Sequence, residues 1–146
     1  MKITIQDLAE GEEEEIIIRC NHMDEHLLKL IYSLKAGRDK LTVLNGDKLF
    51  QVDPKDIYYF EAVDNKVFVY LEKEVYETKL KLYEIEKKYE NTDFFRASKS
   101  VIINLTKMKN VSPAFNGRFE ACMKNGERLG ISRQYASDLK NKLGLK

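Results

Sequence analysis

The chain of 146 residues has little of three things: cysteine, long apolar runs and net charge. With only Cys20 and Cys122 it cannot form a disulfide scaffold, and two lone thiols are typical of a reducing cytoplasm. No apolar run approaches the roughly 18 residues that a membrane span needs. The first residues alternate like a strand rather than forming the apolar stretch of a signal peptide. We therefore expect a cytoplasmic globular protein.

The sequence also lacks the common catalytic motifs. No glycine-rich loop precedes a helix, so there is neither a dinucleotide fingerprint nor a phosphate-binding loop, and no serine lies in a nucleophile-elbow pattern. The segment from His22 to His26 matches H-x-x-E-H, the pattern of an inverted zinc protease. It starts at the expected cap of a helix and a third ligand would have to come from elsewhere, so surface histidines are the simpler interpretation. We predict no catalytic residue, no metal site, no cofactor and no enzyme activity.

The near-neutral total hides an uneven distribution of charge. Overall, 25 Lys and Arg stand against 24 Asp and Glu, a formal net charge of +1. Residues 1–39 carry −4 and residues 40–93 carry −3, whereas residues 94–146 carry +8. A basic last third of the chain is a candidate surface for a polyanion, which the total charge alone would not indicate.

Residues 1–40 are predicted to form a strand, a second strand and a helix. Ile3 and Ile5 alternate with polar residues, and three isoleucines follow an acidic turn. Asn21 or Asp24 can cap the helix, and Gly37 is its expected end. One face of this helix would carry Leu27, Leu28, Ile31 and Leu34. So small a segment buries little area by itself, so we expect it to pack on the rest of the chain or on another copy of it.

Residues 41–146 are predicted to be mainly β with short helices. The dipeptide Asn-Gly, which suits the positive φ angles of type I′ hairpin turns, occurs at residues 45–46, 116–117 and 125–126. Strands are expected at residues 41–45, 48–52, 57–63, 66–72, 75–78, 101–104, 107–112, 118–123 and 128–131. Helices are expected at residues 79–90 and directly after Ser132. Turn signals at such short spacing favour an all-β unit over alternating strands and helices.

The basic third places polar and cationic side chains at three loops. The first loop precedes an apolar strand, the second is a hairpin tip, and the third is the junction between the last strand and the last helix. The candidate DNA-binding residues in these loops are Arg96, Ser98, Lys99, Ser100, Asn116, Arg118 and Arg133. Arg can donate two hydrogen bonds to guanine and Asn can pair with adenine, while Ser and Lys suit phosphates. On composition alone, a basic face that only keeps the protein soluble fits equally well.

Over roughly residues 41–143 the chain resembles the LytTR family of bacterial DNA-binding domains. The resemblance rests on blocks in a fixed order: Asp56-Ile57-Tyr58-Tyr59-Phe60-Glu61, Asn65-Lys66-Val67, a short helix, Phe95-Arg96-x-x-Lys99-Ser100-x-Ile102-Ile103-Asn104, Asn125-Gly126, and Ile131-Ser132-Arg133-x-Tyr135. It implies an elongated β–β–β fold with small helices. It also implies DNA binding through loops along one edge, which enter two successive major grooves and the intervening minor groove, with the candidate residues above as contacts.

The chain departs from the family pattern in two places. The family commonly has His where this chain has Ser98, so base readout there is expected to be altered or relaxed. Residues 1–40 are too few for the phosphorylatable receiver domain that commonly precedes the DNA-binding domain, which implies a stand-alone LytTR regulator. Regulators of this kind are often controlled by a small membrane-protein partner. We therefore expect residues 1–40 to contact such a partner or to form a homodimer on DNA.

Together these observations predict a sequence-specific transcription regulator that binds double-stranded DNA. It would consist of an N-terminal strand-strand-helix segment, residues 1–40, and a LytTR-type DNA-binding domain, residues 41–146. The alternative is a non-enzymatic protein-interaction module whose basic C-terminal face binds an acidic partner or a membrane surface.

Overall fold

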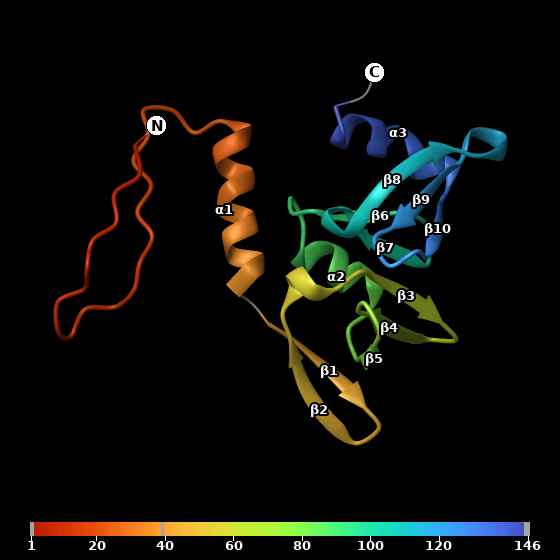
Figure 1. The fold of residues 1–146 in the computed structure, drawn as a ribbon, viewed down its shortest axis with the longest axis horizontal. Coiled ribbons are helices and arrows are strands. Elements are labelled where there is room, and N and C mark those ends of the chain that lie inside the picture. Colours follow the sequence, from red (N-terminus) through yellow and green to blue (C-terminus); the bar gives the residue numbers. More distant parts are fainter. Residues whose placement is uncertain (1, 39, 145–146) are drawn as a thin grey trace.

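The computed structural model describes residues 2–38 and 40–144, and within them ten strands form two antiparallel sheets (Figure 1). The seven-stranded sheet has the order β2-β1-β5-β4-β3-β7-β6. Its strands are β1 (Leu41–Asn45), β2 (Lys48–Val52), β3 (Tyr59–Val63), β4 (Lys66–Tyr70), β5 (Val75–Thr78), β6 (Phe94–Arg96) and β7 (Val101–Asn104). The three-stranded sheet, in the order β10-β9-β8, contains β8 (Met108–Pro113), β9 (Phe119–Met123) and β10 (Arg128–Ile131).

Short helices connect and cover these strands. The α-helices are α1 (Glu25–Arg38), α2 (Leu82–Lys88) and α3 (Arg133–Lys142), and the 3-10 turns are η1 (Pro54–Asp56), η2 (Leu105–Lys107) and η3 (Phe115–Gly117). The predicted fold class, mainly β with short helices, is confirmed. The helix expected at residues 79–90 is shorter, and β6 was not predicted because its three residues are too few to show an alternating pattern.

The three Asn-Gly dipeptides lie at hairpin tips, as predicted. Gly46 connects β1 to β2 with a φ of +65°, and Gly126 connects β9 to β10 with a φ of +91°. At the tip between β8 and β9, Asn116 and Gly117 both have positive φ angles, of 60° and 74°. These backbone conformations favour Gly and Asn, so the turn chemistry of the sequence determines where the strands reverse.

The strands β3 and β7 of the seven-stranded sheet bury consecutive residues, whose side chains point to opposite faces, whereas β2 is mostly exposed. In β3, Phe60 is fully buried beside Ile85 of α2, within a core that extends to β1 and β4. The adjacent Tyr59 packs on the opposite face against Met123 of β9 and Leu139 of α3. This second core joins the two sheets, so the packing of one sheet on the other determines where their loops lie relative to each other.

The predicted strands in the N-terminal segment are wrong. Residues 2–24 form no strand or helix, and Ile3 and Ile5 are 82% and 91% exposed. The predicted turn does form, since the Glu12 N–H donates to the carbonyl of Ala9 at 3.2 Å. The isoleucine runs have high β-propensity, but no neighbouring strand accepts their backbone hydrogen bonds. Propensity without a paired edge does not make a strand, and two strands alone are marginal in water.

The predicted helix of this segment is confirmed as α1. The Asp24 carboxylate accepts a hydrogen bond of 2.8 Å from the Leu27 N–H, so Asp24 rather than Asn21 is the cap. Gly37 lies inside the helix, which ends one residue later at Arg38. Lys29 of α1 lies close to Lys142 of α3, whose pKa is lowered first by burial and then by this neighbouring charge.

The structure also bears on the expectations about a zinc site and a membrane span. His22 lies before α1, so it does not share a helix face with His26 and the two-ligand spacing of a zinc protease does not exist. Over the described residues, no group of three or more His, Cys, Asp or Glu side chains is arranged to hold a metal ion. Nor does any helix in that part of the chain have the length and hydropathy needed to cross a membrane.

Candidate nucleic-acid interface

Three loops that lie far apart in the sequence form one groove of about 740 Å³. They are the β6–β7 loop, the tip around η3 and the junction between β10 and α3. The groove is lined by Ser98, Lys99, Ser100, Asn116, Arg118, Ser132, Arg133 and Gln134. Six of the seven candidate residues from the sequence therefore come together, and Arg96 lies outside the lining. The groove is shared between the sheets, since the first loop belongs to the larger sheet and the other two to the smaller one.

The β6–β7 loop is held by its own backbone and hydroxyl groups. The N–H groups of Ala97 and Ser98 donate to the carbonyl of Val101, at 2.9 and 3.3 Å. The Ser98 hydroxyl accepts the N–H of Ser100 at 3.2 Å, and the Ser100 carbonyl accepts the N–H of Ala62 at 2.8 Å. Ser98 thus uses its side chain to shape the loop, while Lys99 between the two serines is exposed.

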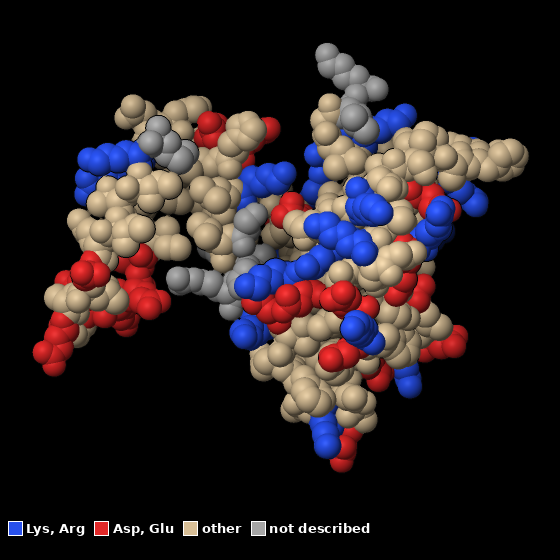
Figure 2. Space-filling view, viewed as in Figure 1, with Lys and Arg blue, Asp and Glu red and all other residues tan. Residues whose placement is uncertain are grey.

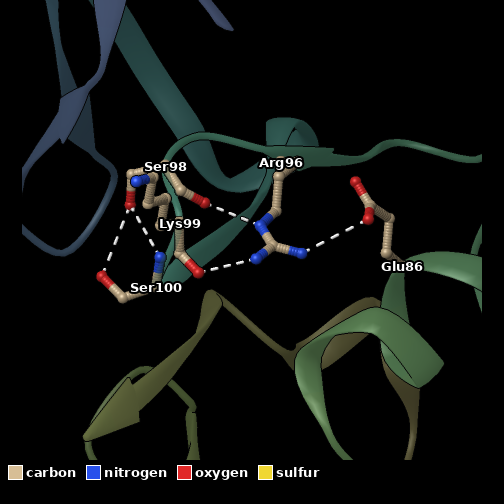
Figure 3. Close-up of polar contacts among 5 residues, drawn as sticks. All are labelled: Glu86, Arg96, Ser98, Lys99 and Ser100. Atoms are coloured by element: carbon tan, nitrogen blue, oxygen red, sulfur yellow. Dashed lines mark hydrogen bonds and ion pairs between the residues drawn. The ribbon is translucent and has the colours of Figure 1, made fainter. Parts of the chain in front are cut away.

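The Arg96 side chain holds this loop by hydrogen bonds to its backbone (Figure 3). Its Nε donates to the carbonyl of Ser98 and its Nη2 to the carbonyl of Lys99, both at 2.6 Å. Its Nη1 lies 3.3 Å from Oε1 of Glu86 on α2. The Arg96 side chain is only 17% exposed. Three interactions around one planar guanidinium give the loop a defined shape, and Arg96 is not among the residues that line the groove.

The β8–β9 tip presents Asn116 and Arg118 to solvent. The Ala114 N–H donates to the carbonyl of Arg118 at 2.8 Å, which closes the tip across η3. Phe115, at the start of η3, is 84% exposed. The positive φ of Asn116 turns the chain so that Asn116 and Arg118 both line the groove.

The junction between β10 and α3 is tied directly to the first loop. The Ser132 N–H donates to the carbonyl of Ala97 at 2.9 Å, a contact between the smaller and the larger sheet. Arg133 and Gln134, the first two residues of α3, are exposed at this end of the helix. Since the N-terminus of a helix carries a partial positive charge, the junction favours an anion such as a phosphate.

The charges around the groove have one sign. Lys99, Arg118 and Arg133 line it, and none of the residues that line it is acidic. Among the described residues, no carboxylate forms a salt bridge with any of these three cations, whereas Arg96 and Arg128 are paired with Glu86 and Glu120. Figure 2 shows one cluster of acidic side chains at the tip of the N-terminal loop, at the far left, and further acidic side chains over the body of the molecule.

Two residues that line the groove, Ser132 and Gln134, were not among the seven predicted contacts, although Ser132 lies in the junction that the sequence singled out. Both flank Arg133, so the signal was available: three polar residues in a row where an apolar strand ends. Ser132 was interpreted as a helix cap, and it does occupy that position, but its hydroxyl makes no capping hydrogen bond.

The profile of the LytTr DNA-binding domain matches residues 47–144. The chain belongs to the LytTr DNA-binding domain family. Its solved relatives include the "LytTr DNA-binding domain of putative methyl-accepting/DNA response regulator from Bacillus cereus". That domain superposes with a TM-score of 0.70 at 31% identity, covering 75% of this chain and 100% of the solved one. The resemblance inferred from the ordered sequence blocks is thus confirmed by sequence and by structure.

The chain is also similar to part of several longer proteins. The sensory transduction protein LytT of Bacillus subtilis (strain 168) is 36% identical over 108 residues, which are 74% of this chain and 45% of the relative. LytT of Enterococcus faecalis (strain ATCC 700802 / V583) is 30% identical over 107 residues, 73% of this chain and 44% of the relative. The transcriptional regulatory protein YpdB of Escherichia coli (strain K12) is 30% identical over 81 residues, 56% of this chain and 33% of the relative. The chain spans less than half the length of these relatives.

Proposed function

We propose that this LytTr protein is a transcription regulator that binds duplex DNA sequence-specifically through the groove formed by its three loops. The observation that carries the proposal is the groove itself: Lys99, Arg118 and Arg133 converge there from three separate segments, without acidic partners among the described residues. Exposed cations of one sign that lie along one groove create a positive potential, which attracts a polyanion. The names of the relatives LytT and YpdB, a sensory transduction protein and a transcriptional regulatory protein, support the same function.

The side chains divide into two roles by their chemistry. Arg133 and Asn116 are exposed and can each make two hydrogen bonds to a base edge, so we assign them to base readout. Lys99, Ser100 and Arg118 are assigned to phosphates, where a point charge or a hydroxyl is sufficient. Ser98, which replaces the family's usual His, is shorter and already shapes its own loop, so base readout at this position is expected to be relaxed.

Arg96 has a different role in this proposal. It was predicted as a DNA contact, but its guanidinium already binds two carbonyl groups and a carboxylate. We infer that Arg96 acts on DNA indirectly, by holding Ser98 and Lys99 in place.

The partners beyond DNA remain predictions. We propose a homodimer on DNA and a cytoplasmic location, with a small membrane-protein regulator as a further partner. Residues 1–40 are the proposed contact region, since Leu28 and Leu30 of α1 are 41% and 47% exposed. Four isoleucines before the helix are more exposed than these leucines: Ile3, Ile5, Ile16 and Ile17. A helix of this kind can pack against another apolar surface.

Selection of duplexes from a random DNA library by the full chain tests the proposed function. An enriched sequence motif, bound in the presence of excess heparin, is the expected result. If heparin and every duplex compete equally well for the protein, it binds polyanions without reading sequence. The alternative, a basic surface that binds another protein, then replaces this proposal.

A further inference from the structure

Gly117 lies directly beneath the side chain of Arg133. A Cβ atom added to Gly117 would lie 3.2 Å from both Cγ and Cδ of Arg133. Of the glycines whose surroundings the structure describes, only Gly117 has any such neighbour within 4 Å. The methylene groups of Arg133 therefore pack on the bare backbone of the β8–β9 tip, where a side chain would not fit without a shift.

This contact connects the two residues assigned to base readout. Gly117 directly follows Asn116 in the tip, and both have positive φ angles. Arg133 comes from a different segment, the start of α3, and its methylene groups contact the tip at Gly117. Because an Arg side chain loses several torsional freedoms when it is held in one position, a surface for its methylene groups lowers the entropic cost of binding.

We propose that Gly117 is a positioning residue that sets the direction of the Arg133 guanidinium and its spacing from Asn116 along the DNA. The inference rests on the proposed DNA-binding function and deepens it. Two features favour glycine here: the φ of +74° and the closeness of the Arg133 side chain to the position of a Cβ atom. The second feature is particular to this site, since Gly46 and Gly126 have positive φ angles with open space around them.

These glycines make the test specific. Gly117→Ala, Gly46→Ala and Gly126→Ala all introduce a Cβ at a positive φ, so they share the backbone strain. Only Gly117→Ala also crowds Arg133. The distance of 3.2 Å is to a flexible side chain rather than to backbone, so we expect Arg133 to move while the fold persists.

The experiment is a double-mutant cycle on affinity for DNA. The wild type, Gly117→Ala, Arg133→Ala and the double variant are titrated against the duplex selected by the wild type and against a scrambled duplex of equal length. Gly117→Ala should lose about fivefold or more in affinity for the selected duplex. A loss of this size lies within the range expected when an Arg side chain no longer contacts a base. It should change affinity for the scrambled duplex less than twofold. In the Arg133→Ala background, Gly117→Ala should change neither affinity by more than about twofold.

Two outcomes would overturn the inference: equal losses from Gly117→Ala with and without the Arg133 side chain, or equal losses in Gly117→Ala and the two control variants. Thermal unfolding of all variants checks the fold. If Gly117→Ala does not fold, Gly117→Asn takes its place, because Asn tolerates positive φ but still carries the Cβ. A wild type that does not prefer the selected duplex overturns the proposed function itself, which separates the two failures.

Discussion

The hydroxyl of Tyr59 donates a hydrogen bond of 2.6 Å to the carboxylate of Glu127, which joins β3 of the larger sheet to the turn between β9 and β10 of the smaller one. The Tyr59 ring stacks on Tyr70, with 4.2 Å between the ring centroids. Burial, followed by the hydrogen bond to Glu127, raises the pKa of Tyr59. This pair is therefore a direct contact between the two sheets whose loops form the groove.

Tyr59→Phe should destabilise the protein by about 1–2 kcal/mol at neutral pH, because it removes a partly buried hydrogen bond to a charged group. The effect should also depend on pH. The raised pKa keeps folded Tyr59 protonated at pH values where the unfolded residue ionises, so its stabilising contribution is present below about pH 10 and declines above it. Urea unfolding between pH 7 and 11 measures both effects.

Tyr83→Phe is the matched control for Tyr59→Phe, since Tyr83 is 70% exposed. The free energy of unfolding of the control should follow that of the wild type across this pH range. If Tyr59→Phe also follows the wild type, the contact between the sheets contributes nothing to stability.

Arg133→Ala should weaken binding to the selected duplex by about 1–3 kcal/mol and relax specificity at one base pair. The physical reason is the loss of two hydrogen bonds to a base edge, which leaves that edge without a partner. Arg128→Ala is the control, because Arg128 is exposed but pairs with Glu120 outside the groove. Fluorescence anisotropy with single-base variants of the duplex measures both quantities. Equal losses for the two arginines would contradict the assignment of Arg133 to base readout.

Lys99→Ala should weaken binding to every duplex by a similar factor and lower the salt dependence. Each phosphate contact contributes about 0.9 to the slope of log K against log salt, so the slope should decrease by about 1. Lys48→Ala, on β2 and outside the groove, should leave the slope unchanged. Titrations of each variant with DNA at several salt concentrations measure this slope. An unchanged slope for Lys99→Ala would show that Lys99 does not contact a phosphate.

Arg96→Lys tests whether Arg96 acts through the loop. Lysine keeps the charge but cannot bind the carbonyls of Ser98 and Lys99 with one planar group, so we expect weaker DNA binding and faster amide exchange in residues 97–100. Glu86→Gln removes the carboxylate charge from the ion pair with Arg96. Because the Glu86 side chain is half exposed, the free energy of unfolding should change by less than about 1 kcal/mol. Normal binding and normal exchange in Arg96→Lys would show that Arg96 is not a positioning residue.

Local features of the sequence predicted most of the domain from residue 41 onward. β1, β2, β5, β7 and β10 have the predicted boundaries, because Asn-Gly turns and alternating apolar residues act over a few positions. The same reasoning failed for the isoleucines near Ile3 and Ile17, whose strand propensity had no partner strand to act on. A strand exists only when another segment pairs with it, and that segment can lie anywhere in the chain.

By itself, the sequence determined the hairpins, the helices, the family and the three loops in which the basic residues lie. Only the tertiary structure decided how these loops meet. It placed Arg133 on Gly117 and tied Ser132 to Ala97, and it bound Arg96 to the backbone of Ser98 and Lys99, outside the lining of the groove. The physical reason is that turns and helix caps depend on neighbouring residues, whereas a groove between loops depends on how two sheets pack. That packing depends on many contacts between residues that are distant in the chain, and local sequence patterns do not predict such contacts.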